Sequence, residues 1–124
     1  MSWTYQQSTG KLTDPAGEWF STCYSGHGEG LNNPAMEAVE GVGPIPAGTY
    51  KIGPARDPID HLGPIALPLT VVRFANPALD RSGFFIHGDN AAADHSASDG
   101  CIVDGLAGRQ LIDASSDDDL EVIP

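Results

Sequence analysis

Short stretches of alternating hydrophobic and polar residues, separated by glycine, proline and asparagine, run through the whole chain. Alternation with a period of two is the pattern of half-buried strands, and the separating residues favour turns. Because Pro68 interrupts the longest apolar run, we expect that run to form a strand pair or an edge strand. The pattern therefore indicates a mainly β protein, with strands predicted at 3–7, 11–12, 18–24, 49–53, 64–74, 84–87, 102–103 and 120–123.

Two segments have helical features. Residues 36–40 fit one helical turn, and the apolar residues within 105–114 recur near a helical spacing. Asp104 comes directly before the second segment and is a candidate helix cap. A chain of 124 residues is large enough to bury a core without a second domain. We expect one domain over residues 1–124, with one or two short helices against the strands.

The chain is strongly acidic, with a net charge of -11 from 17 Asp and Glu against six Lys and Arg. This charge argues against nucleic acid or an anionic membrane surface as a partner, and it is compatible with a basic partner protein. No run of 18 apolar residues occurs, so we expect no membrane insertion. Residues 1–5 also lack the charged and apolar regions of a secretory signal, so any export must use another route.

The two cysteines, Cys23 and Cys101, are too few to act as a disulfide scaffold, and we expect both to be reduced. The favoured interpretation of Cys23 is a small buried hydrophobic residue. A zinc site built from His87, His95 and Cys101 with Asp89 is the metal alternative. The close ligand pairs typical of zinc sites are missing, so no metal or other cofactor is predicted.

Residues 84–103 carry the candidate chemistry. His87 ends one apolar run, a polar loop follows, and Gly100-Cys101 opens a second apolar run, so two short strands would bring His87 and Cys101 close together. A free thiol with a pKa of ~8.5 is mostly protonated at neutral pH, and an imidazole that accepts its proton makes it a nucleophile. The N–H groups of Gly100 and Cys101 are candidate oxyanion donors, because glycine lets a carbonyl oxygen approach the backbone.

The histidine itself needs an acceptor for its second ring nitrogen, because only one tautomer presents a lone pair to the thiol. Asp89 and Ser98 are the side-chain candidates for orienting His87, and Ser98 could instead brace the loop. His95 in the same loop is the alternative base, whereas His61 is assigned to solvent.

Residues 24–34 form a glycine-rich segment with neither a strand nor a helix period. It lacks the Lys-Ser/Thr pair and the strand-to-helix context of a phosphate-binding loop. Two interpretations stay open, a loop beside the substrate and a surface loop that contains turn-forming Asn and Gly.

The stretch from His87 to Cys101 resembles the catalytic signature of the L,D-transpeptidases with the YkuD-like fold. In that signature His-Gly at a strand end precedes Ser/Thr-His-Gly-Cys, and His87-Gly88 and Ser98 to Cys101 occupy those positions here. Asp99 replaces the usual His, and Val103 replaces the usual Arg or Asn. A narrower branch is more similar: His-Gly-Asp-Asn followed by Ser-x-Gly-Cys-Ile resembles the Tlde-type L,D-transpeptidase effectors of type VI secretion systems.

Two other segments extend this resemblance. They are Tyr-Ser-Gly and Asn-Asn-Pro within residues 24–34, and Pro-x-Gly-x-Tyr-x-Ile at residues 46–52. The resemblance implies a YkuD-like β-sandwich or barrel in which the 24–34 segment lies beside the substrate. It implies that His87 and Cys101 are catalytic, with a backbone carbonyl or a hydroxyl, Ser98 for example, orienting the histidine. The candidate substrate-binding residues are Tyr24, Ser25, Asn32, Asn33, Asp89 and Asp99.

The function implied by the resemblance is modification of peptidoglycan. Cys101 would attack the bond between diaminopimelate and D-Ala in a tetrapeptide stem, giving L,D-carboxypeptidase or L,D-transpeptidase activity. The resemblance further implies secretion without a signal peptide, action as a toxin in the periplasm of a target bacterium, and a cognate immunity protein. The alternative is a catalytically silent domain of the same fold that binds a peptide or a peptidoglycan fragment.

Overall fold

The computed structural model describes residues 2–55, 65–88, 98 and 100–124. Within these ranges the chain forms nine strands, two 3-10 helices and one α-helix, so the prediction of a mainly β protein is confirmed. The strands are β1 (Ser2–Gln6), β2 (Lys11–Thr13), β3 (Phe20–Thr22), β4 (Tyr24–Ser25), β5 (Gly48–Ile52), β6 (Leu67–Phe74), β7 (Phe84–His87), β8 (Ile102–Val103) and β9 (Asp119–Ile123). The helices are η1 (Gly28–Gly30), η2 (Pro34–Met36) and α1 (Leu106–Ala114).

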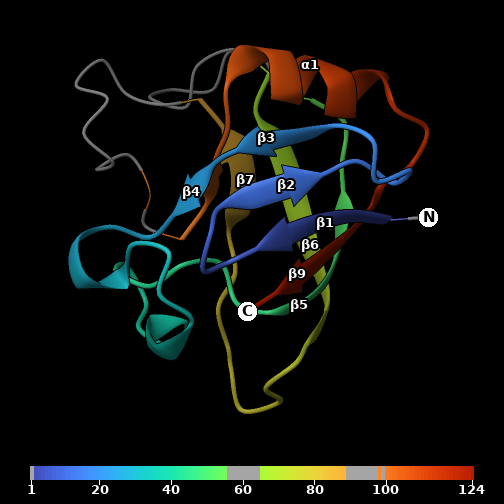
Figure 1. Ribbon diagram of the computed structural model, residues 1–124. Helices are drawn as coiled ribbons and strands as arrows, with labels where there is room; N and C mark the ends of the chain where they lie inside the picture. The colour runs from blue at the N-terminus through green and yellow to red at the C-terminus, as the bar shows by residue number, and fades with distance from the viewer. Residues whose placement is uncertain (1, 56–64, 89–97, 99) are drawn as a thin grey trace.

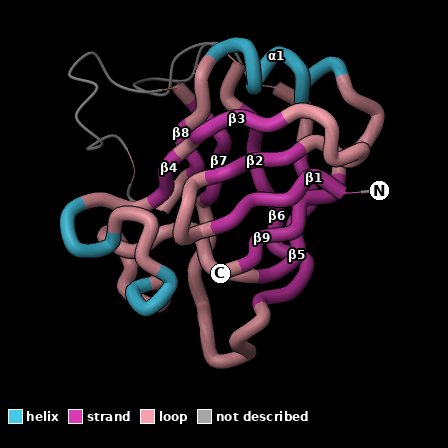
Figure 2. Tube along the Cα trace, in the orientation of Figure 1, coloured by secondary structure: helices cyan, strands magenta, loops and turns pink. Residues whose placement is uncertain are grey.

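All nine strands belong to one sheet, in the order β3-β2-β1-β9-β5-β6-β7-β8-β4. The β1–β9 and β7–β8 pairs are parallel, and the other pairs are antiparallel. The two strands at the ends of this order, β3 and β4, are separated in the chain by Cys23 alone. The sheet therefore curls into a nearly closed barrel, as the tube in Figure 2 shows.

The barrel interior is filled by the inward-facing residues of these strands. Side chains alternate between the two faces of a strand, which is why every second residue of β1 and β9 is buried. The α-helix α1 lies across one end of the barrel (Figure 1) and buries Ile112, while Leu106 and Leu111 remain exposed. The N-cap of this helix is Gly105, with no side-chain capping hydrogen bond, so the prediction of Asp104 as the cap is wrong by one residue. The carboxylate of Asp104 instead accepts a 2.8 Å hydrogen bond from the N–H of Gly105.

The position of β6 corrects one prediction. The strand is central, between β5 and β7, rather than at an edge, although it contains Pro68. The carbonyl of Pro68 accepts a hydrogen bond from the N–H of Gly53, one residue beyond the end of β5. Because the N–H and C=O of one strand residue point the same way, the N–H that Pro68 lacks would point to the place where β5 has already ended. The proline therefore removes only one hydrogen bond, at the end of the β5–β6 ladder, which a central strand tolerates.

The helical turn predicted at 36–40 is replaced by η2, which begins slightly earlier in the chain. None of the helices in the described ranges is both long and apolar enough to cross a membrane.

Candidate active site

The parallel pair of β7 and β8 brings the two halves of the candidate chemistry together. Ile86 lies opposite Ile102, and His87 lies opposite Val103. Cys101 directly precedes β8, so the nucleophile candidate is two residues before the position opposite the base candidate. The neighbouring strand β4 belongs to the glycine-rich segment and pairs with the other edge of β8.

His87 is buried, with only 3% of its surface exposed. Its Nδ1 lies 2.7 Å from the carbonyl oxygen of Gly88. When Nδ1 carries the proton and donates it to this carbonyl, Nε2 keeps a lone pair, which is the tautomer a general base requires. The described partner that orients the imidazole is thus a backbone carbonyl. Asp89, the other side-chain candidate, lies outside the described residues.

Ser98 braces the segment before Cys101, which is the second of the two roles considered for it. Its buried Oγ donates to the carbonyl of Cys101 (2.6 Å) and accepts from the N–H groups of Gly26 (2.9 Å) and Gly100 (3.1 Å). One donor and two acceptor sites are all that a hydroxyl offers, so Ser98 has no capacity left to orient His87. The expectation that Ser98 orients the base is therefore corrected.

The hydrogen bond from Gly100 to Ser98 also bears on the oxyanion donors. The N–H of Gly100 is directed to the Ser98 hydroxyl, so in this arrangement it does not face an incoming carbonyl oxygen. The N–H of Cys101 is the remaining candidate of the two. Gly100 itself has a φ of +135°, a conformation that favours glycine.

The glycine-rich segment forms hydrogen bonds to the residues that precede Cys101. Ser25 is fully buried, and its hydroxyl lies within 3.4 Å of the Gly100 carbonyl, to which it donates. The side-chain oxygen of Asn32 accepts from the N–H of Ser25, and that of Asn33 accepts from the N–H of Ala35 at the start of η2. Ser25, Asn32 and Asn33 therefore brace this loop, and their predicted substrate contacts stay a prediction.

Of the remaining predicted site residues, only Tyr24 lies within the described ranges. Tyr24 lies on β4 opposite Val103 and is buried, with 6% of its surface exposed. Asp89, Asp99 and the alternative base His95 lie outside the described residues. Within the described ranges, no group of three or more His, Cys, Asp and Glu is arranged to hold a metal ion.

Cys101 opens onto a cavity of about 240 Å³. The thiol is partly exposed, and its Sγ lies 3.9 Å from the carbonyl oxygen of Gly83, a weak hydrogen-bond contact. A nucleophile must be reachable by substrate, and Cys101 meets that requirement. The lining residues are Glu40, Gly41, Arg81, Ser82, Gly83, Phe84, Gly100 and Cys101.

The sequence analysis missed Arg81 and Glu40 in this cavity. Residues 80–83 have the composition of a turn, so this composition gave no reason to place Arg81 at the site. Its scarcity was an available signal, because the chain has only six Lys and Arg and this one lies shortly before the strand that carries His87.

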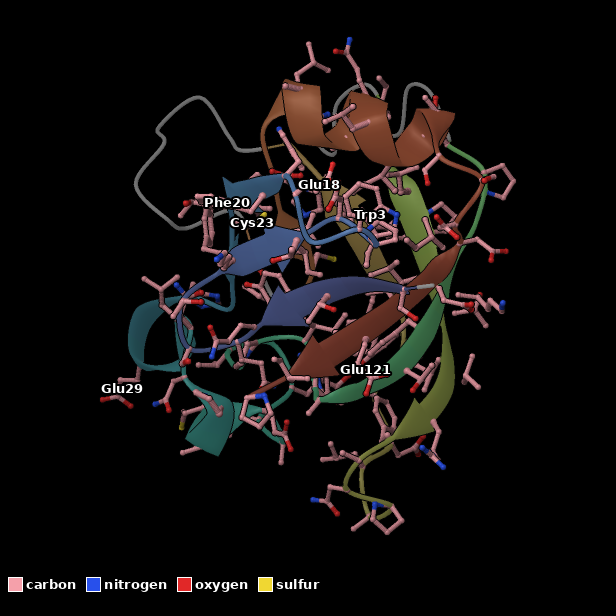
Figure 3. The ribbon with its side chains drawn as sticks, turned by 45° about the vertical axis from the view of Figure 1, so that its right-hand side comes forward. Trp3, Glu18, Phe20, Cys23, Glu29 and Glu121 are labelled. Carbon is pink, nitrogen blue, oxygen red and sulfur yellow. The ribbon has the colours of Figure 1, made fainter. Side chains whose placement is uncertain are left out.

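The second cysteine has a different environment. Cys23 lies between β3 and β4 (Figure 3), is 5% exposed, and has its Sγ 3.5 Å from the hydroxyl of Ser21. Burial raises the pKa of the Cys23 thiol, and the nearby charge of Asp104 raises it further. Cys23 is therefore protonated at neutral pH and behaves as the small buried residue that was predicted. Both cysteines are free thiols.

The fold and the site define a mainly β protein with a histidine and a cysteine on adjoining strand segments. The chain belongs to the Tlde1 domain family, which matches residues 21–109. This match contains the glycine-rich segment, His87, Ser98 and Cys101. Membership in this family indicates an effector of type VI secretion. No curated protein matches the chain.

Proposed function

We propose that this protein is a cysteine-dependent effector that modifies peptidoglycan, with L,D-carboxypeptidase and L,D-transpeptidase chemistry on tetrapeptide stems. The observation that carries the proposal is the placement of His87, oriented by the Gly88 carbonyl, on the strand beside the segment that bears a cavity-lining cysteine. The Tlde1 family match supports the effector part of the proposal.

The first chemical step needs a thiolate. Nε2 of His87 accepts the proton of Cys101, and the thiolate then attacks the carbonyl carbon of the bond between an L-centre and a D-amino acid. The transfer requires the Cys101 thiol to lie within hydrogen-bond reach of Nε2 of His87. Catalytic hydrogen bonds commonly shorten only when substrate is bound.

The later steps return the proton and release the acyl group. The D-residue leaves as an amine that takes the proton from His87, and a thioester with Cys101 remains. Water then gives a shortened stem, which is carboxypeptidase activity. The amine of another D-amino acid gives exchange or transpeptidation instead.

The size of the cavity fits part of a stem rather than a whole one. A volume of about 240 Å³ is below the range of ~300–1,000 Å³ that is typical of ligand pockets. This is room for a group of amino-acid size next to the nucleophile. The rest of the stem would lie over the surface around the cavity.

The decisive experiment is mass spectrometry of tetrapeptide muropeptides after incubation with the protein, with and without an added D-amino acid. Loss of the terminal D-Ala shows hydrolysis, and its replacement by the added residue shows exchange. Cys101→Ala is the inactive control. If the unaltered protein leaves the stems unchanged but binds them, the alternative of a silent binding domain replaces this proposal.

The site of action follows from the substrate, because peptidoglycan lies outside the cytoplasm. We infer delivery by a type VI apparatus into the periplasm of a target bacterium, and a cognate immunity protein in the producer. The charge of -11 favours an inhibitor with a basic contact surface. Expression with a signal peptide should be toxic in a Cys101-dependent manner, and expression without one should be harmless. Equal tolerance of both folded forms would contradict the effector role.

A further inference from the structure

The strand β3 has one edge that pairs with no other strand of the sheet. It stands at one end of the strand order, so its single strand neighbour is β2. In an antiparallel pair, successive residues point their N–H and C=O groups alternately toward the partner strand and away from it. The N–H of Cys23 donates to the carbonyl of Gly10 (2.7 Å), and the N–H of Asp14 donates to the carbonyl of Trp19 (2.9 Å). These two bonds show which residues face β2.

Phe20 and Thr22 therefore point their backbone N–H and C=O groups away from β2. They alternate along the chain with Trp19, Ser21 and Cys23, the positions that face β2. Among the residues that the structure describes, none forms a hydrogen bond with these outward groups. Phe20 is 57% exposed, and Thr22 is also exposed. Exposed strand edges of this kind are the surfaces to which an extended peptide adds a further strand.

A cavity lies at each end of β3, and α1 contributes to the lining of both. The cavity of about 280 Å³ contains Thr22 and Arg109, and the cavity of about 290 Å³ contains Trp19 and Leu111. Figure 1 shows α1 beside β3. Trp19 and Thr22 are separated by ~10 Å in an extended chain, so a short added strand would span both cavities.

The surroundings of this edge are apolar and acidic. Phe20 and Leu111 expose 57% and 45% of their surface, and Glu18 and Asp113 are exposed nearby in the chain. The Nζ of Lys11 lies 4.6 Å from the centre of the Phe20 ring, so this ring already attracts a cation. The whole chain has a net charge of -11, so two copies would repel each other. Charge therefore favours a basic partner over a second copy of this chain.

We propose that the outer edge of β3 is a docking site for another protein, which adds an extended strand with basic and apolar side chains. The backbone of that strand bonds to the outward groups of Phe20 and Thr22, and its apolar side chains contact Phe20 and enter the cavities beside α1. Backbone hydrogen bonds supply affinity in this mode of binding, and the cavities supply specificity. These two cavities share no lining residue with the Cys101 cavity, so the proposal does not depend on the proposed enzymatic function.

The test uses a capped octapeptide of alternating lysine and valine, titrated into isotope-labelled protein and followed by NMR. The amide signals of Phe20 and Thr22 should shift, and bound peptide should slow the hydrogen exchange of both amides. The same peptide N-methylated at every residue should bind at least about tenfold more weakly, because it lacks strand donors. A peptide with glutamate in place of lysine should bind at least about tenfold more weakly as well. Unshifted signals at β3, or equal binding of either altered peptide, would overturn the proposal.

Thr22→Pro is the matched change in the protein. Proline removes the outward N–H of Thr22 but no hydrogen bond to β2, so the fold should persist while peptide binding weakens about tenfold. Thr22→Val keeps the backbone donor and should bind within about twofold of the unaltered protein. Equal binding by a folded Thr22→Pro variant would contradict the proposal, and the N-methylated peptide decides if this variant does not fold. Sedimentation should show a monomer, because a dimer that Thr22→Pro separates would make a second copy the occupant and overturn the basic partner.

Discussion

Two cavities of this protein are lined by the same kinds of residue, but they place the charged residues differently around the cysteine. Each is lined by one cysteine, one buried arginine and one carboxylate, which are Cys101, Arg81 and Glu40 in one cavity and Cys23, Arg109 and Asp104 in the other. Composition alone would make both cysteines equal candidates for the nucleophile. The two cysteines differ in whether the carboxylate of their cavity is buried or exposed.

In the Cys23 cavity the acid is the buried group next to the thiol. Asp104 is 3% exposed, and its charge together with burial raises the pKa of Cys23. In the Cys101 cavity the acid is exposed, and the group packed against the cysteine's own backbone segment is Arg81. A thiolate is disfavoured beside a buried carboxylate and favoured beside a buried cation. Among the described residues, the buried acid lies beside Cys23, so the comparison favours Cys101 as the proposed nucleophile.

The Cys23 cavity still serves the site, through the base. The N–H of Asp104 donates to the carbonyl of His87 (2.9 Å), and Nε of Arg109 donates to the carbonyl of Asp104 (3.2 Å). A Cβ added to Gly88 would lie 2.8 Å from Nη2 of Arg109, so this arginine packs against the residue whose carbonyl orients His87. One cavity therefore presents Cys101, the proposed nucleophile, and the other supports His87, the proposed base.

The largest expected effect separates the two cysteines by activity. Cys101→Ala should lower the rate of muropeptide conversion by a factor on the order of 10^4 or more, because no other group replaces the thiolate. Cys23→Ala should keep activity within a few-fold and cost about 1 kcal/mol of stability through a small cavity. Conversion assays on folded variants measure both. Equal losses would remove the distinction between the cavities.

The base should be nearly as sensitive as the nucleophile. His87→Ala removes the proton acceptor and should lower the conversion rate by several orders of magnitude. His95→Ala is the matched histidine control and should have a mild effect. A loss in His95→Ala as large as that in His87→Ala would reassign the base.

Alkylation should separate the cysteines without a substrate. Iodoacetamide at neutral pH should label Cys101 first, and Cys23 should react mainly after unfolding, because its thiol is buried with a raised pKa. Peptide mass spectrometry at short times measures the ratio of the two products. Comparable labelling of both cysteines in the folded protein would contradict the assignment.

The sequence predicted most of the elements because strand alternation is a local pattern. The strand at 84–87 coincides with β7, and the helix at 105–114 differs from α1 by one residue at its start. The position of β6 escaped prediction because the effect of Pro68 depends on where the neighbouring strand ends. That is a property of the sheet and not of residues 64–74.

The candidate site was harder to predict for a related physical reason. The signature identified His87 and Cys101, but asparagine and serine have the same side chain whether they bind a substrate or brace a loop. Only their partners distinguish these roles, as Ser98 demonstrates by bonding to both Gly26 and Cys101. Arg81 escaped notice because its hydrogen-bond acceptors lie 37 to 44 residues away in the chain.

The smallest expected effect tests whether Asp104 is the unfavourable charge in the Cys23 cavity. Burial raises the pKa of its carboxyl, although hydrogen bonds from Cys23, Ser21 and Gly105 and the charge of Arg109 lower it. The folded state then holds the proton more tightly than the unfolded state. This group's contribution to stability is therefore full at acid pH and is lost as pH rises through the raised pKa.

Asp104→Asn cannot lose that contribution, and its side-chain oxygen can still accept from Ser21 and Gly105. The Tm of Asp104→Asn relative to the unaltered protein should therefore rise by a few degrees from pH 4 to pH 7, where the natural carboxyl becomes charged. Glu18→Gln, at an exposed turn between β2 and β3 (Figure 3), should show no such trend. The alkylation of Cys23 should also become somewhat faster, because a neighbouring negative charge is gone. If the relative Tm instead falls between pH 4 and pH 7, the ionised Asp104 stabilises the fold, and the contrast between the two cavities must come from burial of Cys23 alone.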